Sequence, residues 1–215
     1  MFKSLRRRFI KLTFHLLYHQ FAFTYDAVAW LVSLGQWKAW GRMALGHVRG
    51  MRVLELGHGP GHLLIALARA GRSPVGVDLS PQMIAIARRR IRREHLDIPQ
   101  VRCRAQALPL RSGAFDSVVA AFPTAYIVDP STLLEVKRVT HAHSRLVIVA
   151  GAQLAGRQPS AHFIDWLYRV TGQSDWRVEE HASIFQRIGM QERIELEGAG
   201  AGTVTLVIAE KVQVG

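Results

Sequence analysis

The segment Val53-Leu54-Glu55-Leu56-Gly57-His58-Gly59-Pro60-Gly61 most constrains what this chain can fold into. A short run of strand-like residues leads into three alternating glycines, and Leu63 to Ala70 then carries the apolar spacing of a helix. A strand that opens through glycines into a helix is typical of nucleotide binding, because glycine lets the backbone turn sharply and approach a ligand closely. The segment therefore predicts an α/β domain with a nucleotide-like cofactor at this loop.

Two common glycine loops are excluded by the residues that follow. A phosphate-binding P-loop needs Gly-Lys-Ser/Thr after the loop, whereas His62-Leu63 follows here. A dinucleotide-binding loop has the spacing G-x-G-x-x-G, and its sixth position is His62 in this chain. The spacing that remains is G-x-G-x-G, preceded by Glu55.

The rest of the chain alternates strand-like and helix-like runs. Strands are predicted at 52–56, 74–77, 101–105, 115–121 and 145–150, and helices at 63–70, 81–94 and 130–139. This alternation predicts a doubly wound, mostly parallel sheet. After a helix near 181–188, strands 192–196 and 203–209 are predicted to close the chain as a hairpin, which brings the sheet to seven strands.

An acidic residue follows the second strand. Asp78 comes 17 residues after Gly61, and a carboxylate there can accept hydrogen bonds from ribose hydroxyls. In the alternative interpretation Asp78 is only a favourable charge at a helix N-terminus. Because the glycine loop lies upstream at the distance expected for a cofactor site, we favour the interpretation in which Asp78 binds the ribose. The predicted cofactor-binding residues are Glu55, Gly57, His58, Gly59, Gly61, Asp78, Leu79, Met83, Gln106, Ala107 and Phe122.

These motifs resemble those of class I S-adenosylmethionine-dependent methyltransferases. The G-x-G-x-G loop with Glu55 carries the resemblance, together with Asp78 and with Gln106-Ala107, which follow the third strand where this class contacts adenine. The resemblance implies a Rossmann-like methyltransferase fold, S-adenosyl-L-methionine as the cofactor, and transfer of a methyl group.

From Tyr25 to Val149 the chain resembles the ubiquinone/menaquinone biosynthesis C-methyltransferase family, through Tyr25-Asp26 and through Arg138-Val139. It departs from that family at Val28-Ala29 and at Ala142-His143-Ser144, so the quinone substrate is not implied. Membrane-associated phospholipid N-methyltransferases are similar as well, since they share the core and a basic N-terminal helix.

The chain is strongly basic, with a formal net charge of +12, and a surface this basic attracts nucleic acid or anionic lipid. Basic residues gather in two clusters, Lys3, Arg6, Arg7, Arg8 and Lys11 in the first, and Arg88, Arg89, Arg90, Arg92 and Arg93 in the second. Residues 2–20 have the apolar spacing of an amphipathic helix whose composition suits a membrane interface. In the alternative interpretation this helix packs on its own domain.

No membrane span or cleaved leader is expected, because Lys11, His15 and His19 interrupt the N-terminal apolar stretch. A single cysteine, Cys103, suits a reducing compartment. We therefore expect a cytoplasmic protein, peripheral on the inner face of the membrane.

The predicted organisation has N-terminal helices over 1–47 that cap the active site, and a methyltransferase domain over 48–215 whose insert, 152–180, covers the acceptor. His162 in that insert is the first choice for a general base. Tyr25 can close over the sulfonium, since an aromatic face attracts a cation. No metal site is expected, because the histidines and the one cysteine lack ligand spacing.

The leading hypothesis is a methyltransferase acting on a lipophilic or small-molecule acceptor, such as a phospholipid headgroup or a quinol-like compound, at a membrane surface. A nucleic-acid methyltransferase is the less favoured alternative, since the Asn/Asp-Pro-Pro-Tyr/Phe run typical of base-amine methylation is absent. The third hypothesis is a non-catalytic cofactor-binding module that docks a partner through its N-terminal helix.

Overall fold

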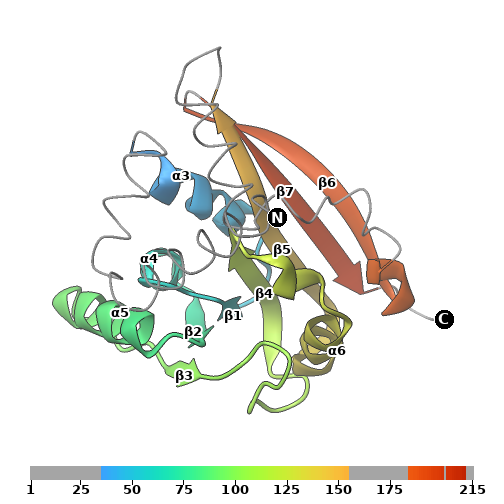
Figure 1. Ribbon diagram of the computed structural model, residues 1–215, viewed down its shortest axis with the longest axis horizontal. Coiled ribbons are helices and arrows are strands. Elements are labelled where there is room, and N and C mark those ends of the chain that lie inside the picture. Colours follow the sequence, from blue (N-terminus) through green and yellow to red (C-terminus); the bar gives the residue numbers. More distant parts are fainter. Residues whose placement is uncertain (1–34, 155–183, 201, 212–215) are drawn as a thin grey trace, which may run out of the picture.

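A computed structural model describes residues 35–154, 184–200 and 202–211 of the chain (Figure 1). The predicted helix 2–20, Tyr25 and His162 lie outside these residues, as does most of the predicted insert. No helix among the described residues is long and apolar enough to cross a bilayer.

A seven-stranded sheet forms the centre of the molecule. Its strands are β1 (Arg52–Leu56), β2 (Ser73–Asp78), β3 (Gln100–Arg102), β4 (Phe115–Ala121), β5 (Thr140–Leu154), β6 (Met190–Ala199) and β7 (Gly202–Lys211). Their order is β3-β2-β1-β4-β5-β7-β6. The first five run parallel, and β7 is antiparallel to both β5 and β6. The predicted mostly parallel seven-stranded sheet is therefore confirmed.

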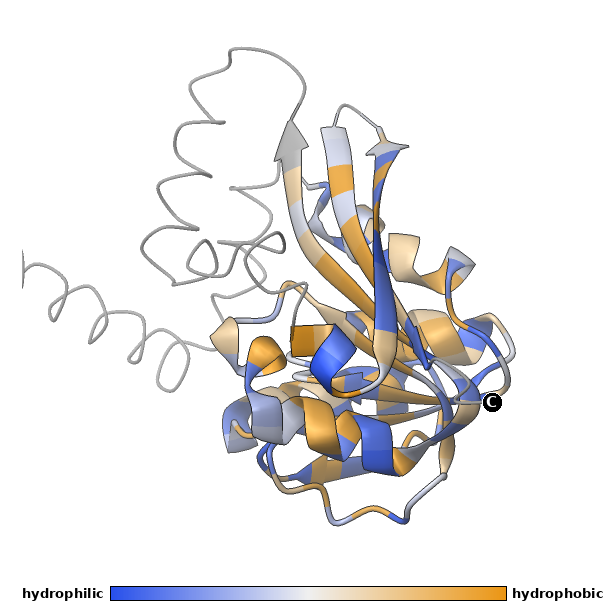
Figure 2. Cartoon of the chain, turned by 90° about the vertical axis from the view of Figure 1, so that its right-hand side faces the viewer, coloured by the Kyte–Doolittle hydropathy of each residue, from blue (hydrophilic) through white to orange (hydrophobic). Residues whose placement is uncertain are grey.

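Helices cover both faces of this sheet. They include α3 (Trp37–Arg42), the 3₁₀ helix η2 (Met43–Gly46), α4 (His62–Arg69), α5 (Pro81–Arg93), the 3₁₀ helix η3 (Ala125–Val128) and α6 (Pro130–Val139). Neighbouring β1 residues face opposite sides, so Val53 packs in the cluster beneath α3 and α4, and Leu54 in the cluster beneath α6. Figure 2 shows hydrophobic segments along the long inner strands of the sheet and long hydrophilic segments along the edge strand β6. The central strands β1 and β4 are apolar runs because both of their faces are buried, whereas the edge strand β6 is largely polar.

Several boundaries differ from the prediction. β3 has only three residues, whereas a strand over 101–105 was expected. β5 begins at Thr140 and runs to Leu154, so it includes the first residues of the predicted insert. Antiparallel pairing with β7 extends from Arg145 to Leu154 across a bulge between Val149 and Gly151, and these backbone hydrogen bonds keep the strand extended. The closing hairpin is also longer than expected, because its strands continue into the glycine-rich segment.

Candidate functional site

The site lies at the carboxyl edge of the parallel strands, where β1 ends in the glycine loop. The Gly57 and His58 N–H groups donate to the Val77 carbonyl at 2.8 and 3.2 Å, which ties the loop to the end of β2. Gly57, Gly59 and Gly61 all have positive φ, at 68°, 51° and 80°, a region that favours glycine. Ligands of open α/β sheets bind at this edge.

Each loop glycine is needed for a different reason. A Cβ on Gly57 would lie 2.6 Å from Tyr126 Oη, and a Cβ on Gly61 would lie 2.9 Å from the Ala87 Cβ of α5. The close approach that the third glycine allows is therefore to a helix of the protein. A Cβ on Gly59 would meet nothing within 4 Å, so Gly59 faces open space that a ligand can enter.

Asp78 is held in place from two sides at the end of β2. Its Oδ2 accepts a hydrogen bond from Gly59 N–H at 2.8 Å, and its Oδ1 accepts one from Ser80 N–H at 2.8 Å. Ser80 in turn caps α5, since its Oγ accepts from Met83 N–H at 3.3 Å. Asp78 thus joins the glycine loop to the start of α5, with lone pairs left on both oxygens.

Two buried side chains at the loop have polar atoms without a hydrogen-bond partner. Glu55 is 2% exposed and His58 is 3% exposed, and neither Glu55 Oε2 nor His58 Nε2 is paired. Burial raises the pKa of the Glu55 carboxyl well above its ordinary value, and the charge of Asp78 raises it further, while a backbone hydrogen bond from Leu64 acts the other way. Burial lowers the pKa of the His58 imidazole, against the opposing charge of Asp78.

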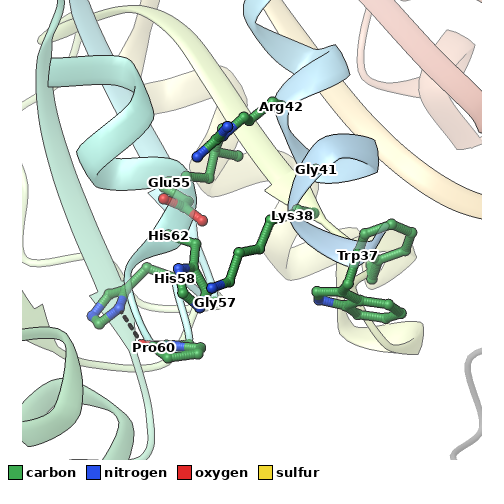
Figure 3. A pocket seen from close by; sticks show the side chains of 13 residues that line it. Trp37, Lys38, Gly41, Arg42, Glu55, Gly57, His58, Pro60 and His62 are labelled. Atoms are coloured by element: carbon green, nitrogen blue, oxygen red, sulfur yellow. Dashed lines mark hydrogen bonds between the residues drawn. The ribbon is translucent and has the colours of Figure 1, made fainter. Parts of the chain in front are cut away.

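A cavity opens between the glycine loop and α3 (Figure 3). Its lining includes five of the predicted cofactor residues, namely Glu55, Gly57, His58, Gly59 and Phe122. Lys38 and Arg42 of α3 also line it, and Figure 3 shows both side chains extending from α3 toward the loop. The cavity therefore combines buried acceptors on the loop side with two cations on the helix side.

Phe122 also lines this cavity. It follows β4 and adopts a left-handed backbone conformation, with φ of 51°, which is strained for an aromatic residue. Its ring stacks on the Trp37 ring, with centroids 4.0 Å apart, and its N–H donates to the Val149 carbonyl at 2.9 Å. These contacts hold the strained residue at the edge where the cofactor is expected.

The remaining predicted cofactor residues do not line this cavity. Leu79 is 55% exposed beside Asp78, and Met83 is fully buried in the first turn of α5. Gln106 donates to Asp129 Oδ2 at 3.3 Å, and Ala107 is exposed next to it. Their roles toward a cofactor stay predictions, as do those of Tyr25 and His162.

Sequence reasoning missed three groups at the site. Lys38 and Arg42 were overlooked because they precede β1 and reach the loop only through packing of α3. Tyr126 was overlooked too, although its hydroxyl donates to the Leu56 carbonyl at 3.0 Å and fills the space beside Gly57. His141 takes no part in this site, since its Nε2 lies 2.8 Å from Asp116 Oδ1 where β4 begins, at the opposite edge of the sheet.

The strand order and the glycine loop with its acid define a Rossmann-like methyltransferase fold. Residues 53–143 match the family model described as "Methyltransferase domain". A SAM-dependent methyltransferase of known structure from Thermotoga maritima, titled a possible histamine N-methyltransferase, is similar with a TM-score of 0.66 and 18% identity, covering 92% of this chain and 99% of that one. The predicted class of fold is confirmed.

Among proteins of known function, a demethylmenaquinone methyltransferase of Thermus thermophilus is 34% identical over 62% of this chain and 63% of its own length. The ubiquinone/menaquinone biosynthesis C-methyltransferase UbiE of Bordetella parapertussis is 31% identical over 70% of this chain and 60% of its own. This chain thus spans about three fifths of the length of the curated relatives that it matches. The predicted resemblance to that family is confirmed.

Proposed function

We propose that this protein is an S-adenosylmethionine-dependent methyltransferase that acts on a lipophilic or small-molecule acceptor at a membrane surface. The observation that carries the proposal is the loop itself, where Gly59 borders open space and Asp78 is fixed beside it. The similarity to methyltransferases of quinone biosynthesis supports a lipophilic acceptor, such as a quinol-like compound or a phospholipid headgroup.

The residues of the site fit the parts of this cofactor. The free lone pairs of Asp78 suit ribose hydroxyls, and the unpaired Glu55 Oε2 suits a cationic group such as the cofactor's ammonium. Lys38 and Arg42 offer positive charge for its carboxylate. When bound, the cofactor supplies a methyl group activated by its sulfonium.

The protein's share of the reaction is positioning and exclusion of water. Methyl transfer is an in-line displacement, so the acceptor atom must be held in line with the methyl group and the departing sulfur. The stacked rings of Trp37 and Phe122 form an apolar wall for this purpose. In this proposal the N-terminal region through residue 47 caps the site, Tyr25 faces the sulfonium, and His162 removes a proton where the acceptor requires it.

The activity is tested by incubating the full chain with methyl-labelled cofactor and a total membrane lipid extract, and in a parallel reaction with total RNA. We expect label in a lipid product. Asp78→Asn should bind the cofactor about tenfold to hundredfold more weakly, because a hydrogen bond to a charged group contributes about 1.5–3 kcal/mol. Asp97→Asn, an exposed site before β3, is the matched control and should bind as the wild type does. Label in an RNA fraction alone, or cofactor binding without any labelled product, contradicts the proposal.

Membrane association through residues 2–20 has its own test. Replacing Lys3, Arg6, Arg7, Arg8 and Lys11 together by Gln in the full chain removes the attraction to anionic headgroups. We expect weaker sedimentation with vesicles that contain phosphatidylserine and unchanged cofactor affinity. Binding equal to that of the wild type would contradict a membrane role for this segment.

A further inference from the structure

In the ranges that the structure describes, three arginines near the β6 edge of the sheet are paired with carboxylates, whereas four near the β3 edge are not. Beside β6 and β7, the guanidinium groups of Arg49, Arg145 and Arg193 all reach the Glu210 carboxylate, at 3.1, 2.6 and 2.7 Å. Glu195 gives Arg193 a second carboxylate at 2.5 Å. Each of these three arginines is therefore paired with a carboxylate of the protein.

At the opposite end, α5 packs on β2 and β3 and carries arginines that the fold does not balance (Figure 1). We define the arginine face as the four exposed arginines of this helix, Arg88, Arg89, Arg92 and Arg93. In the described part of the chain no carboxylate forms an ion pair with any of the four. Arg90 differs, since it is half-buried and donates to the Pro60 carbonyl at 2.7 Å.

The surroundings of α5 are basic as well. Nine arginines and three acidic residues lie between positions 69 and 104. Of the three acids, Asp78 belongs to the cofactor loop and Glu94 already pairs with Arg69, which leaves Asp97. Exposed Arg102 and Arg104 beside β3 extend the positive surface beyond the helix.

Helix formation does not account for the arginine face. The helix dipole favours cations in the last turn, which includes Arg92 and Arg93 but not Arg88 or Arg89. Arg88 and Arg92 are four residues apart, as are Arg89 and Arg93, and like charges at that spacing weaken a helix. An anionic partner outside the described residues would remove this repulsion.

We propose that the arginine face binds an anionic phospholipid surface, in parallel with the predicted N-terminal contact. The choice of lipid rests on the proposed function, whose acceptor is lipophilic. Guanidinium groups bind phosphate in a bidentate manner, and an exposed convex helix can lie against a flat headgroup layer. Single-stranded nucleic acid is disfavoured because it binds by stacking on aromatic side chains, and the large exposed apolar side chains of the described residues include no aromatic one.

The test compares two full-length variants that lose the same charge. In the first, Arg88, Arg89 and Arg92 are replaced by Gln, which keeps helix propensity. In the control, exposed Arg111, Lys137 and Arg187 are replaced by Gln. Binding to phosphatidylserine-rich vesicles and to phosphatidylcholine vesicles is measured by sedimentation without cofactor, alongside circular dichroism and binding of a single-stranded RNA oligonucleotide.

A basic residue near an anionic surface strengthens binding about fivefold, so the arginine-face variant should lose roughly a hundredfold in affinity for phosphatidylserine-rich vesicles. The control should bind like the wild type, and salt should weaken the wild-type interaction. Equal loss in both variants, or loss of RNA binding with vesicle binding intact, would overturn the inference. Because the assay needs no cofactor, its result is independent of whether methyl transfer is observed.

Discussion

At the scale of single residues, the most informative group is the buried Glu55 carboxyl. It lines the cavity and has an unpaired oxygen, and its pKa is raised mainly by burial. The folded protein therefore holds this proton more tightly than the unfolded chain does. Its contribution to the free energy of unfolding must fall as pH rises from the ordinary glutamate pKa toward the raised one.

We predict that Glu55→Gln makes the cofactor-free protein more stable at neutral pH than the wild type. At pH values above the raised pKa, each unit of the rise lowers the free energy of unfolding by about 1.4 kcal/mol. Gln does not titrate, so the variant avoids this loss. Denaturant titrations between pH 4 and 8 should show the difference between variant and wild type growing with pH. The same substitution should weaken cofactor binding. A stability difference between variant and wild type that does not change with pH would contradict a raised pKa for Glu55.

Gly57 and Gly59 form a matched pair of glycines, because both have positive φ but only Gly57 has a neighbour in the way. We predict that Gly57→Ala lowers the free energy of unfolding by about 2–4 kcal/mol, since the methyl group displaces Tyr126 as well as straining the backbone. Gly59→Ala should cost only about 1 kcal/mol but should weaken cofactor binding more than tenfold. Calorimetry and thermal melts on both variants measure the two effects, and equal stability losses would contradict this reading.

At the scale of elements, the start of α4 lies so close to α5 that Gly61 has no room for a side chain. The distance of 2.9 Å from a Cβ on Gly61 to Ala87 means that Gly61→Ala must push the helices apart. We predict a loss of about 2–3 kcal/mol in stability, of which Ala87→Gly in the same chain restores about 1 kcal/mol. Denaturant titration of the two single variants and the double variant gives the coupling. Strict additivity would show that the cost is backbone strain alone.

Elements also show which features a sequence can predict. The glycine loop, Asp78 and the bounds of β4 and α6 follow from local patterns, so the sequence was sufficient for them. The length of β5 depends on its antiparallel partner β7 and on a bulge, and neither is visible in its own residues. Lys38 and Arg42 reach the site only because α3 packs against α4, which is a tertiary contact.

At the scale of the whole molecule, Glu210 links the C-terminal strands to the segment before β1. Arg145, buried at 8% side-chain exposure, donates to both Glu210 and the His47 carbonyl. Hydrogen bonding from Arg193 lowers the pKa of Glu210, assisted by the charges of Arg145 and Arg49. The stability that this carboxylate contributes is present above the ordinary glutamate pKa and is lost as pH falls through the lowered value.

We predict that Glu210→Gln lowers the free energy of unfolding at pH 7 by about 2–3 kcal/mol, because it leaves Arg145 buried without a counter-charge. Glu94→Gln removes the exposed pair with Arg69 and should cost at most about 1 kcal/mol. Urea denaturation at pH 7 and again at acidic pH compares the two variants. The Glu210 effect should shrink in acid, and a loss as small as that of the control would contradict its linking role.

The two backbone hydrogen bonds to the Asp78 carboxylate affect the entropy of cofactor binding. Since Gly59 and Ser80 already fix both carboxylate oxygens, the side chain has little rotamer freedom left to lose when a ribose arrives. Ordering a side chain on binding typically costs about 0.5–1.5 kcal/mol, and that cost is met here during folding. The ribose half of the site is therefore preorganised.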